Sequence, residues 1–130
     1  MDLEAGIIYL AGPISADPVK NHKKFEKATK KLRKKGYNIY SPVEFEKLHP
    51  GKSWNFYMSQ CISEVPFKQF VVVLPGWEES KGANLEVAIA RFLDIPVLKY
   101  PKLTKIKFNT KEWKEIIKNV HAKADSGNLE

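Results

Sequence analysis

Residues 70–74 are Phe-Val-Val-Val-Leu, the most hydrophobic stretch of the chain. A short, valine-rich apolar run that stops sharply at Pro75-Gly76 predicts a strand buried on both faces. Strands of that kind occur almost only in parallel sheets with helices on each side. The run therefore predicts an α/β fold in which this strand lies at the centre of the sheet.

Strand and helix signals alternate on both sides of this run. Strands are predicted over residues 7–10, 37–40 and 95–100, and helices over residues 17–36, 53–66, 85–92 and 111–123. A strand, a helix and a second strand in this order build a parallel pair with a right-handed crossover. We therefore predict a Rossmann-like three-layer α/β sandwich with a central parallel sheet of four to five strands.

A chain of 130 residues, of which 43% are hydrophobic, suits one compact core. We predict one domain over residues 1–123 and a flexible C-terminal tail over residues 124–130. The apolar run at residues 7–10 is too short for a signal peptide or a membrane span, so we expect a cytoplasmic protein without a membrane partner. A lone cysteine and three widely separated histidines lead us to expect no disulfide, metal or cofactor.

The net charge of +7 is concentrated in one predicted helix, because residues 20–35 hold nine lysines or arginines against one glutamate. Phe25, Ala28 and Leu32 form a narrow apolar stripe on this helix, and the lysines occupy the rest of its circumference. Aromatic residues do not interleave with the charges for base stacking. We therefore favour a solvated helix face, with nucleic-acid binding through residues 20–35 as the alternative.

Two segments follow predicted parallel strands, where ligands bind in open α/β sheets. In the first, residues 9–15, Gly12 would let a ligand approach the backbone and Tyr9 lies near the strand end. An ordinary tight turn is the alternative interpretation of this segment, because one glycine beside one proline is a weak signal.

The second segment, from Pro75 to Glu86, places a tryptophan, three carboxylates and two glycines between a strand and a helix. Ser80, Gly82 and Ala83 could present a hydroxyl and backbone N–H groups to an anion at the helix start. Glu86 is expected in about the first turn, where the helix dipole favours the ionised form that a nucleophilic carboxylate needs. The alternative is that Glu86 only caps the helix.

Three motifs together resemble the nucleoside 2-deoxyribosyltransferase-like superfamily, most closely its small branch with a Pro-Gly-Trp loop, and are also similar to the 2′-deoxynucleoside 5′-phosphate N-hydrolases. They are Ile-Tyr-Leu-Ala-Gly-Pro-Ile at residues 8–14, Gly-Tyr-Asn-Ile-Tyr-Ser-Pro at 36–42, and Leu-Pro-Gly-Trp-Glu-Glu-Ser-Lys-Gly-Ala-Asn-Leu-Glu at 74–86. The resemblance covers residues 7–97. It implies a flavodoxin-like fold, a homo-oligomer, and cleavage or exchange at the N-glycosidic bond of a nucleoside or its 5′-monophosphate.

The resemblance also implies roles for individual residues. Glu86 matches the nucleophilic glutamate that forms a glycosyl-enzyme intermediate, and Tyr9 matches the tyrosine that orients it. Ser80 matches a position that contacts the 5′-phosphate in nucleotide-cleaving relatives. The full set that we assign to substrate binding is Gly12, Pro13, Ile14, Trp77, Ser80, Gly82 and Ala83.

One departure from the family pattern concerns the residue that handles the leaving base. Relatives carry an aspartate in a Tyr-Met-x-x-Asp motif, whereas this chain has Cys61 at that position. A thiol is a poor substitute for a carboxylic acid. Glu64, Glu78 or Glu79 are candidates for the missing proton donor. For Cys61 itself we favour a core position over a nucleophilic role, and a nucleotide-binding protein with reduced catalysis is the alternative to an enzyme.

Overall fold

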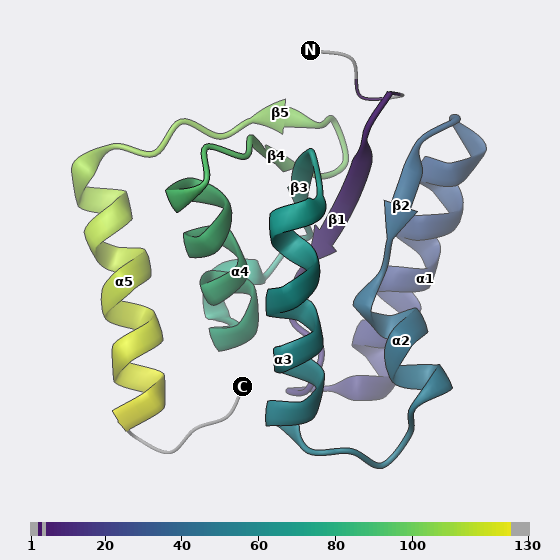
Figure 1. Ribbon diagram of the computed structural model, residues 1–130, viewed down its shortest axis with the longest axis horizontal. Coiled ribbons are helices and arrows are strands. Elements are labelled where there is room, and N and C mark those ends of the chain that lie inside the picture. Colours follow the sequence, from purple (N-terminus) through teal and green to yellow (C-terminus); the bar gives the residue numbers. More distant parts are fainter. Residues whose placement is uncertain (1–2, 4, 126–130) are drawn as a thin grey trace.

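The computed structural model describes residue 3 and residues 5–125 (Figure 1). Its strands are β1 (Ile7–Ala11), β2 (Asn38–Tyr40), β3 (Phe70–Val73), β4 (Val97–Lys99) and β5 (Thr104–Lys105). Its α-helices are α1 (Pro18–Lys34), α2 (Pro42–Leu48), α3 (Trp54–Glu64), α4 (Lys81–Phe92) and α5 (Thr110–Asp125), with short 3-10 helices at Val65–Phe67 and Trp77–Glu79. Within the described part of the chain, no helix combines the length and the apolar character needed to cross a membrane.

The strands form one sheet in the order β2-β1-β3-β4-β5. The first four strands are parallel, and β5 pairs antiparallel with β4. All residues of β3 are buried between β1 and β4, which confirms the central strand predicted from the valine run. The order 2-1-3-4-5 is that of flavodoxin-like doubly wound sheets. The predicted α/β sandwich is therefore confirmed, with an antiparallel edge strand added to the parallel sheet.

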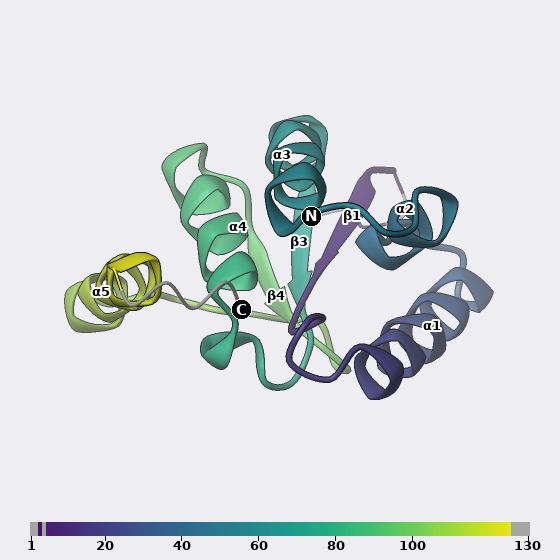
Figure 2. The same ribbon diagram turned by 90° about the horizontal axis from the view of Figure 1, so that it is seen from below.

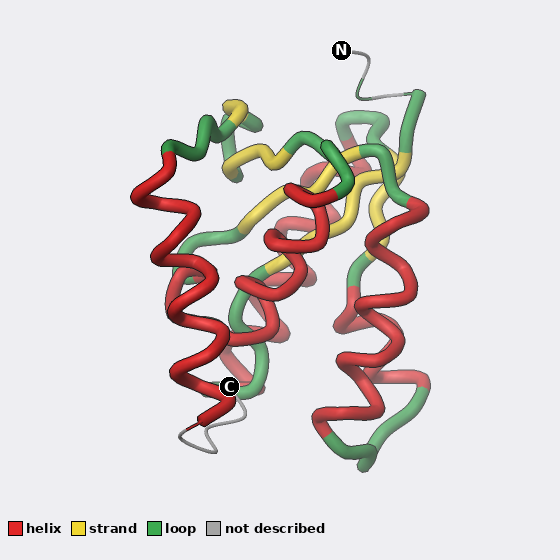
Figure 3. The backbone as a smooth tube through the Cα atoms, turned by 60° about the vertical axis from the view of Figure 1, so that its left-hand side comes forward, coloured by secondary structure: helices red, strands yellow, loops and turns green. Residues whose placement is uncertain are grey.

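Two hydrophobic cores lie on opposite faces of the sheet, because successive side chains of a strand point to opposite sides. Ile8 and Leu10 of β1 pack with the buried stripe of α1. Tyr9 and Ala11 pack instead against α3 and α4 on the other face. Figure 2 shows α1 on one side of the strands and α3 and α4 on the other. Helix α5 packs beside α4 at the outer edge of the layer that α3 and α4 form (Figure 3). Its Ile116 belongs to the core between these helices and the sheet.

Helix α1 begins and ends where its sequence signals predict. The side chain of Asp17 accepts a hydrogen bond from the backbone of Lys20 at 3.3 Å, and Pro18 occupies the first helical position. Beyond the helix end, Gly36 takes a φ of 96°, which glycine adopts without strain. The stripe of Phe25, Ala28 and Leu32 is buried, and the lysines lie at the surface or at its margin.

Several boundaries differ from the predictions. α2 was not predicted, because Ser41-Pro42 was interpreted only as the end of a strand, although proline is also favoured at the first position of a helix. Ile62 and Phe92 share the helical spacing of the apolar residues in α3 and α4, yet both are exposed. α4 begins at Lys81, earlier than predicted, and α5 continues to Asp125. The remainder of the predicted tail, residues 126–130, lies outside the described residues.

Candidate active site

A cavity of about 210 Å³ lies at the carboxyl end of the sheet, where the two predicted ligand segments meet. The first segment contributes Gly12, Ile14 and Ser15, and the second contributes Ser80, Gly82, Ala83 and Glu86. Helix α3 adds Trp54, Tyr57, Met58 and Cys61, and the remaining lining residues are Pro18, Glu46 and Lys52. Residues far apart in the chain therefore converge on one concave site, as the parallel topology requires.

Tyr9 and Glu86 meet beside this cavity. The Tyr9 hydroxyl donates a hydrogen bond to the Glu86 carboxyl group, and both side chains are buried. Tyr9 reaches Glu86 because the alternation of β1 directs it toward the face that α4 covers. Tyr9 does not line the cavity itself, whereas Glu86 does. This contact joins the two residues that the sequence singled out as nucleophile and orienting group.

Ser80, and not Glu86, caps helix α4. The Ser80 hydroxyl accepts a hydrogen bond from the backbone N–H of Ala83 at 3.1 Å. Glu86 is the sixth residue of the helix and lies beyond the first turn, so it cannot serve as its cap. The capping interpretation of Glu86 is therefore wrong. The Ala83 N–H, which was expected to face an anion, donates to Ser80 in this structure.

The loop before α4 is held by Asn84, which the sequence analysis did not single out. Its side-chain amide donates hydrogen bonds to the carbonyl oxygens of Trp77, Glu78 and Ser80 at 3.3, 3.0 and 2.7 Å. Asn84 is only 1% exposed, so the three contacts are shielded from water. Trp77, which was expected to bind substrate, does not line the cavity. Its side chain is part of the core that also contains Ala83 and Val87 of α4.

Three residues of the two ligand segments act through close packing. A Cβ atom on Gly12 would lie 3.1 Å from the Cβ of Leu74, so glycine allows the two segments to approach. Pro13 packs against Gly76, where an added Cβ would lie 3.4 Å from the proline ring. A Cβ on Gly82 would lie 3.3 Å from the sulfur of Met58. Gly12 and Gly82 line the cavity, and Pro13 braces the second loop without lining it.

Cys61 lies on α3 within hydrogen-bonding reach of both Tyr9 and Glu86. Burial is the main cause that raises the pKa of its thiol well above the ordinary value. A thiol in this state is neither a ready nucleophile nor a strong proton donor at neutral pH. Its place in the core on the α4 side agrees with the interpretation of Cys61 as a core residue.

The electrostatics of Glu86 differ from the expectation based on the helix dipole. Burial raises the pKa of the Glu86 carboxyl to about 8, while the hydrogen bonds from Tyr9 and Cys61 lower it and the charge of Glu46 raises it further. Desolvation thus outweighs the dipole, whose effect fades beyond the first turn. Glu86 is therefore mostly protonated at pH 7.

The carboxylates proposed as proton donors lie elsewhere. Glu64 forms an ion pair with Lys68, with the two charged atoms 2.7 Å apart. Glu78 lines a different cavity, which it shares with residues of α5. Glu79 does not line the candidate active site. Glu46 is the second glutamate that lines the candidate site. Sequence analysis missed it because its helix, α2, was not predicted.

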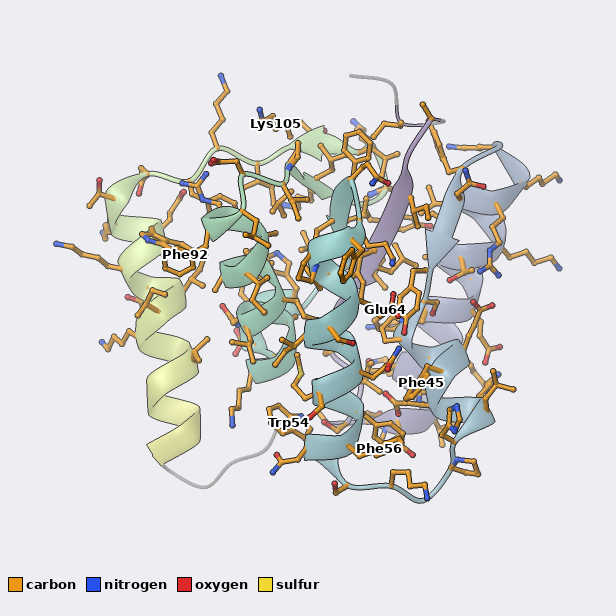
Figure 4. The ribbon with its side chains drawn as sticks, viewed as in Figure 1. Phe45, Trp54, Phe56, Glu64, Phe92 and Lys105 are labelled. Carbon is orange, nitrogen blue, oxygen red and sulfur yellow. The ribbon has the colours of Figure 1, made fainter. Side chains whose placement is uncertain are left out.

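Helix α3 contributes two aromatic side chains, Trp54 and Tyr57, to the lining of the cavity. The ammonium group of Lys81 lies over the ring of Trp54, 4.3 Å from its centroid, in a cation–π contact. The Tyr57 hydroxyl donates a hydrogen bond to the carbonyl oxygen of His49 at 2.6 Å. Figure 4 shows Trp54 and Phe56 at the N-terminal end of α3, where the ring of Phe45 from α2 stacks on Phe56 at 6.0 Å. The spacing of Trp54 and Tyr57 predicts only that they share one face of a helix, and the sequence does not show that this face borders a cavity.

A family model described as a domain of unknown function, DUF4406, matches residues 7–99, a range that contains both ligand segments and every residue lining the cavity. No curated protein and no solved structure matches the chain.

Proposed function

The chain belongs to the DUF4406 family, a domain family of unknown function, and we propose that this member cleaves or exchanges the N-glycosidic bond of a nucleoside or nucleoside 5′-monophosphate. Glu86 is the proposed nucleophile, and Tyr9 is the group that orients it. The resemblance of three loop motifs to the nucleoside 2-deoxyribosyltransferase-like superfamily supports this assignment, and it implies a homo-oligomer as the working form.

The observation that carries the proposal is the buried hydrogen bond between Tyr9 and Glu86 at the edge of the cavity. The phenol fixes the orientation of the carboxyl group, and a site shielded from water strengthens its interaction with charge that develops on a substrate. In the proposed reaction, one Glu86 oxygen attacks the anomeric carbon as the bond to the base nitrogen breaks. Water or a second base then displaces Glu86, and two inversions give net retention.

The lining of the cavity suits the parts of a nucleoside. Trp54 and Tyr57 offer aromatic surface on which a base can stack. Gly12 and Gly82 both line the cavity, and at Gly82 the missing side chain leaves room beside Met58 for a sugar to approach the backbone. Lys52 lines the same cavity and carries the positive charge that a 5′-phosphate requires.

A nucleotide-binding protein with little or no turnover is the second candidate. Cys61 favours it, because its thiol occupies the position where related motifs carry an aspartate and its raised pKa makes it a weak acid. Nucleic-acid binding through the basic face of α1 is a third candidate. Only the charge of the helix supports it. Of the residues of α1, only Pro18 lines the cavity.

Base release tests the proposal. The protein is incubated with the four common 2′-deoxynucleosides and their 5′-monophosphates, and free base is separated and quantified. We expect release from at least one substrate, lost in Glu86→Ala and Glu86→Gln. Substrate binding without release in the wild-type protein would favour the second candidate. Steeply salt-dependent nucleic-acid binding that needs the lysines of α1 would favour the third.

A further inference from the structure

The cavity is lined by a second carboxyl group besides that of Glu86. Glu46 lies on α2, a helix that contacts both α1 and α3 (Figure 2). It lines the cavity together with Glu86 and Cys61, and its side chain is only 18% exposed. Its charge acts on both of these neighbours, raising the pKa of Glu86 and of Cys61. Glu46 is therefore electrostatically coupled to the proposed nucleophile.

A histidine from a third helix lies beside Glu46. The Nε2 atom of His22, on α1, lies 3.6 Å from a carboxyl oxygen of Glu46. This nitrogen is buried and makes no hydrogen bond to any described residue, so the carboxyl group of Glu46 is its polar neighbour. The titratable groups that surround Glu46 include His22 from α1, Cys61 from α3, Glu86 from α4 and Lys52 from the loop before α3.

We propose that Glu46 is the general acid and base of this site, supplying the carboxyl group that the position of Cys61 lacks. The inference rests on the proposed N-glycosidic chemistry. It follows from the shared cavity and from the contact with His22, because the other carboxylates considered for this role lie outside the site. His22 is a positioning residue for Glu46.

The reaction balances with these two carboxyl groups. In the reactive form of the site the proton lies on Glu46 and Glu86 is ionised. Glu86 then forms a bond to the anomeric carbon, the carbon–nitrogen bond breaks, and its electron pair stays on the base nitrogen. Protonated Glu46 gives its proton to the departing base and becomes a carboxylate. A water molecule then attacks the anomeric carbon while Glu46 takes one of its protons, and Glu86 leaves as a carboxylate. Both groups return to their starting states.

The test compares Glu46→Gln with Glu44→Gln, a matched change on the exposed side of the same helix. The value of kcat/KM for base release is measured on the best substrate of the deoxynucleoside panel and on 7-methyl-2′-deoxyguanosine and its 5′-monophosphate. A 7-methylguanine leaves as a neutral base and needs no proton. We expect Glu46→Gln to lose about 100-fold or more on the ordinary substrate and only a few-fold on the methylated ones. Glu44→Gln should resemble the wild type on both.

Two further readouts separate catalysis from folding. Glu46→Asp, which keeps the carboxyl group, should recover part of the lost rate. The basic limb of the kcat/KM profile on the ordinary substrate reports loss of the proton from Glu46, so it should disappear in Glu46→Gln. Equal losses on ordinary and methylated substrates, or no loss on either, would overturn the role of Glu46.

Failure of this inference is distinguishable from failure of the proposed function. If the wild-type protein releases base, Glu86→Gln does not and Glu46→Gln matches the wild type, only the assignment of Glu46 fails. If the wild-type protein releases no base from any substrate, the proposed function fails and the assignment of Glu46 fails with it.

Discussion

The Tyr9 hydroxyl on β1 donates a hydrogen bond to the Glu86 carboxyl group on α4, although the two residues are 77 positions apart. β1 and α4 flank the carboxyl end of the sheet, so the contact depends on the parallel topology and not on local sequence. It places a buried acid at the wall of a cavity, where the protonation and the reactivity of that acid can both be measured.

The first prediction concerns stability and pH. The folded-state pKa of Glu86 is about 8, against 4.5 for the free side chain, so between these values the folded protein holds a proton that the unfolded chain has released. The free energy of unfolding should therefore fall as pH rises through this window, by at most about 1.4 kcal/mol per pH unit from this group. Glu86→Gln should remove that slope in urea titrations between pH 5 and about 8.

The matched control is Glu78→Gln, because Glu78 is an exposed carboxylate near the same loop. It should keep the wild-type slope. Identical pH dependence in the wild-type protein and Glu86→Gln would show that Glu86 titrates normally in the folded state.

The second prediction concerns Tyr9. Tyr9→Phe removes the hydrogen bond that lowers the pKa of Glu86, so the acid limb of the kcat/KM profile should move to higher pH. A hydrogen bond to a charged group is worth about 1.5–3 kcal/mol, so base release at pH 7 should fall about 10- to 100-fold. Tyr40→Phe is the control, because the Tyr40 ring stacks on Tyr9 at 5.4 Å. A pH profile for Tyr9→Phe that matches this control would contradict the orienting role.

The third prediction concerns Ser80, which has both a structural and a proposed binding role. Ser80→Ala and Ser53→Ala each remove a helix cap, so each should lower the free energy of unfolding by about 1 kcal/mol. Only Ser80→Ala should also raise KM for a nucleoside 5′-monophosphate relative to the nucleoside. An unchanged ratio of the two KM values would limit Ser80 to capping.

The fourth prediction concerns Cys61. Because the thiol is buried and its pKa is raised, iodoacetamide should modify it slowly at pH 7.5 in the folded protein. Modification should become rapid in concentrated guanidinium chloride, as followed by intact-protein mass spectrometry. Rapid labelling of the folded protein would instead indicate an activated thiol and revive the nucleophilic interpretation of Cys61.

The sequence predicts most of the sheet because its signals are local. The valine run of β3 and the Asp-Pro start of α1 report on burial and capping within a few residues. β5 was missed because a strand of two exposed residues carries no hydrophobic pattern. α2 was missed because it is only seven residues long and begins at Pro42, and a proline directly after a strand was interpreted only as the end of that strand.

The candidate site is less accessible from sequence than the fold. Glu86 and Tyr9 were found through motif resemblance, but the raised pKa of Glu86 arises from burial by elements that are distant in the chain. Glu46 carries no motif, and only the packing of α2 against α1 and α3 brings it to the cavity. The Ala83 N–H was assigned to a ligand because sequence does not show that Ser80 already accepts its hydrogen bond.

The central claim is that Glu86 forms a covalent bond to the sugar of a nucleoside or nucleotide. The most direct measurement is mass spectrometry of protein quenched in acid during turnover of its best substrate, followed by peptide mapping. We predict a sugar or sugar-phosphate ester on the peptide that contains Glu86, with both the adduct and base release absent in Glu86→Gln. Undiminished base release by Glu86→Gln, or an adduct on the peptide that contains Cys61, would contradict the claim.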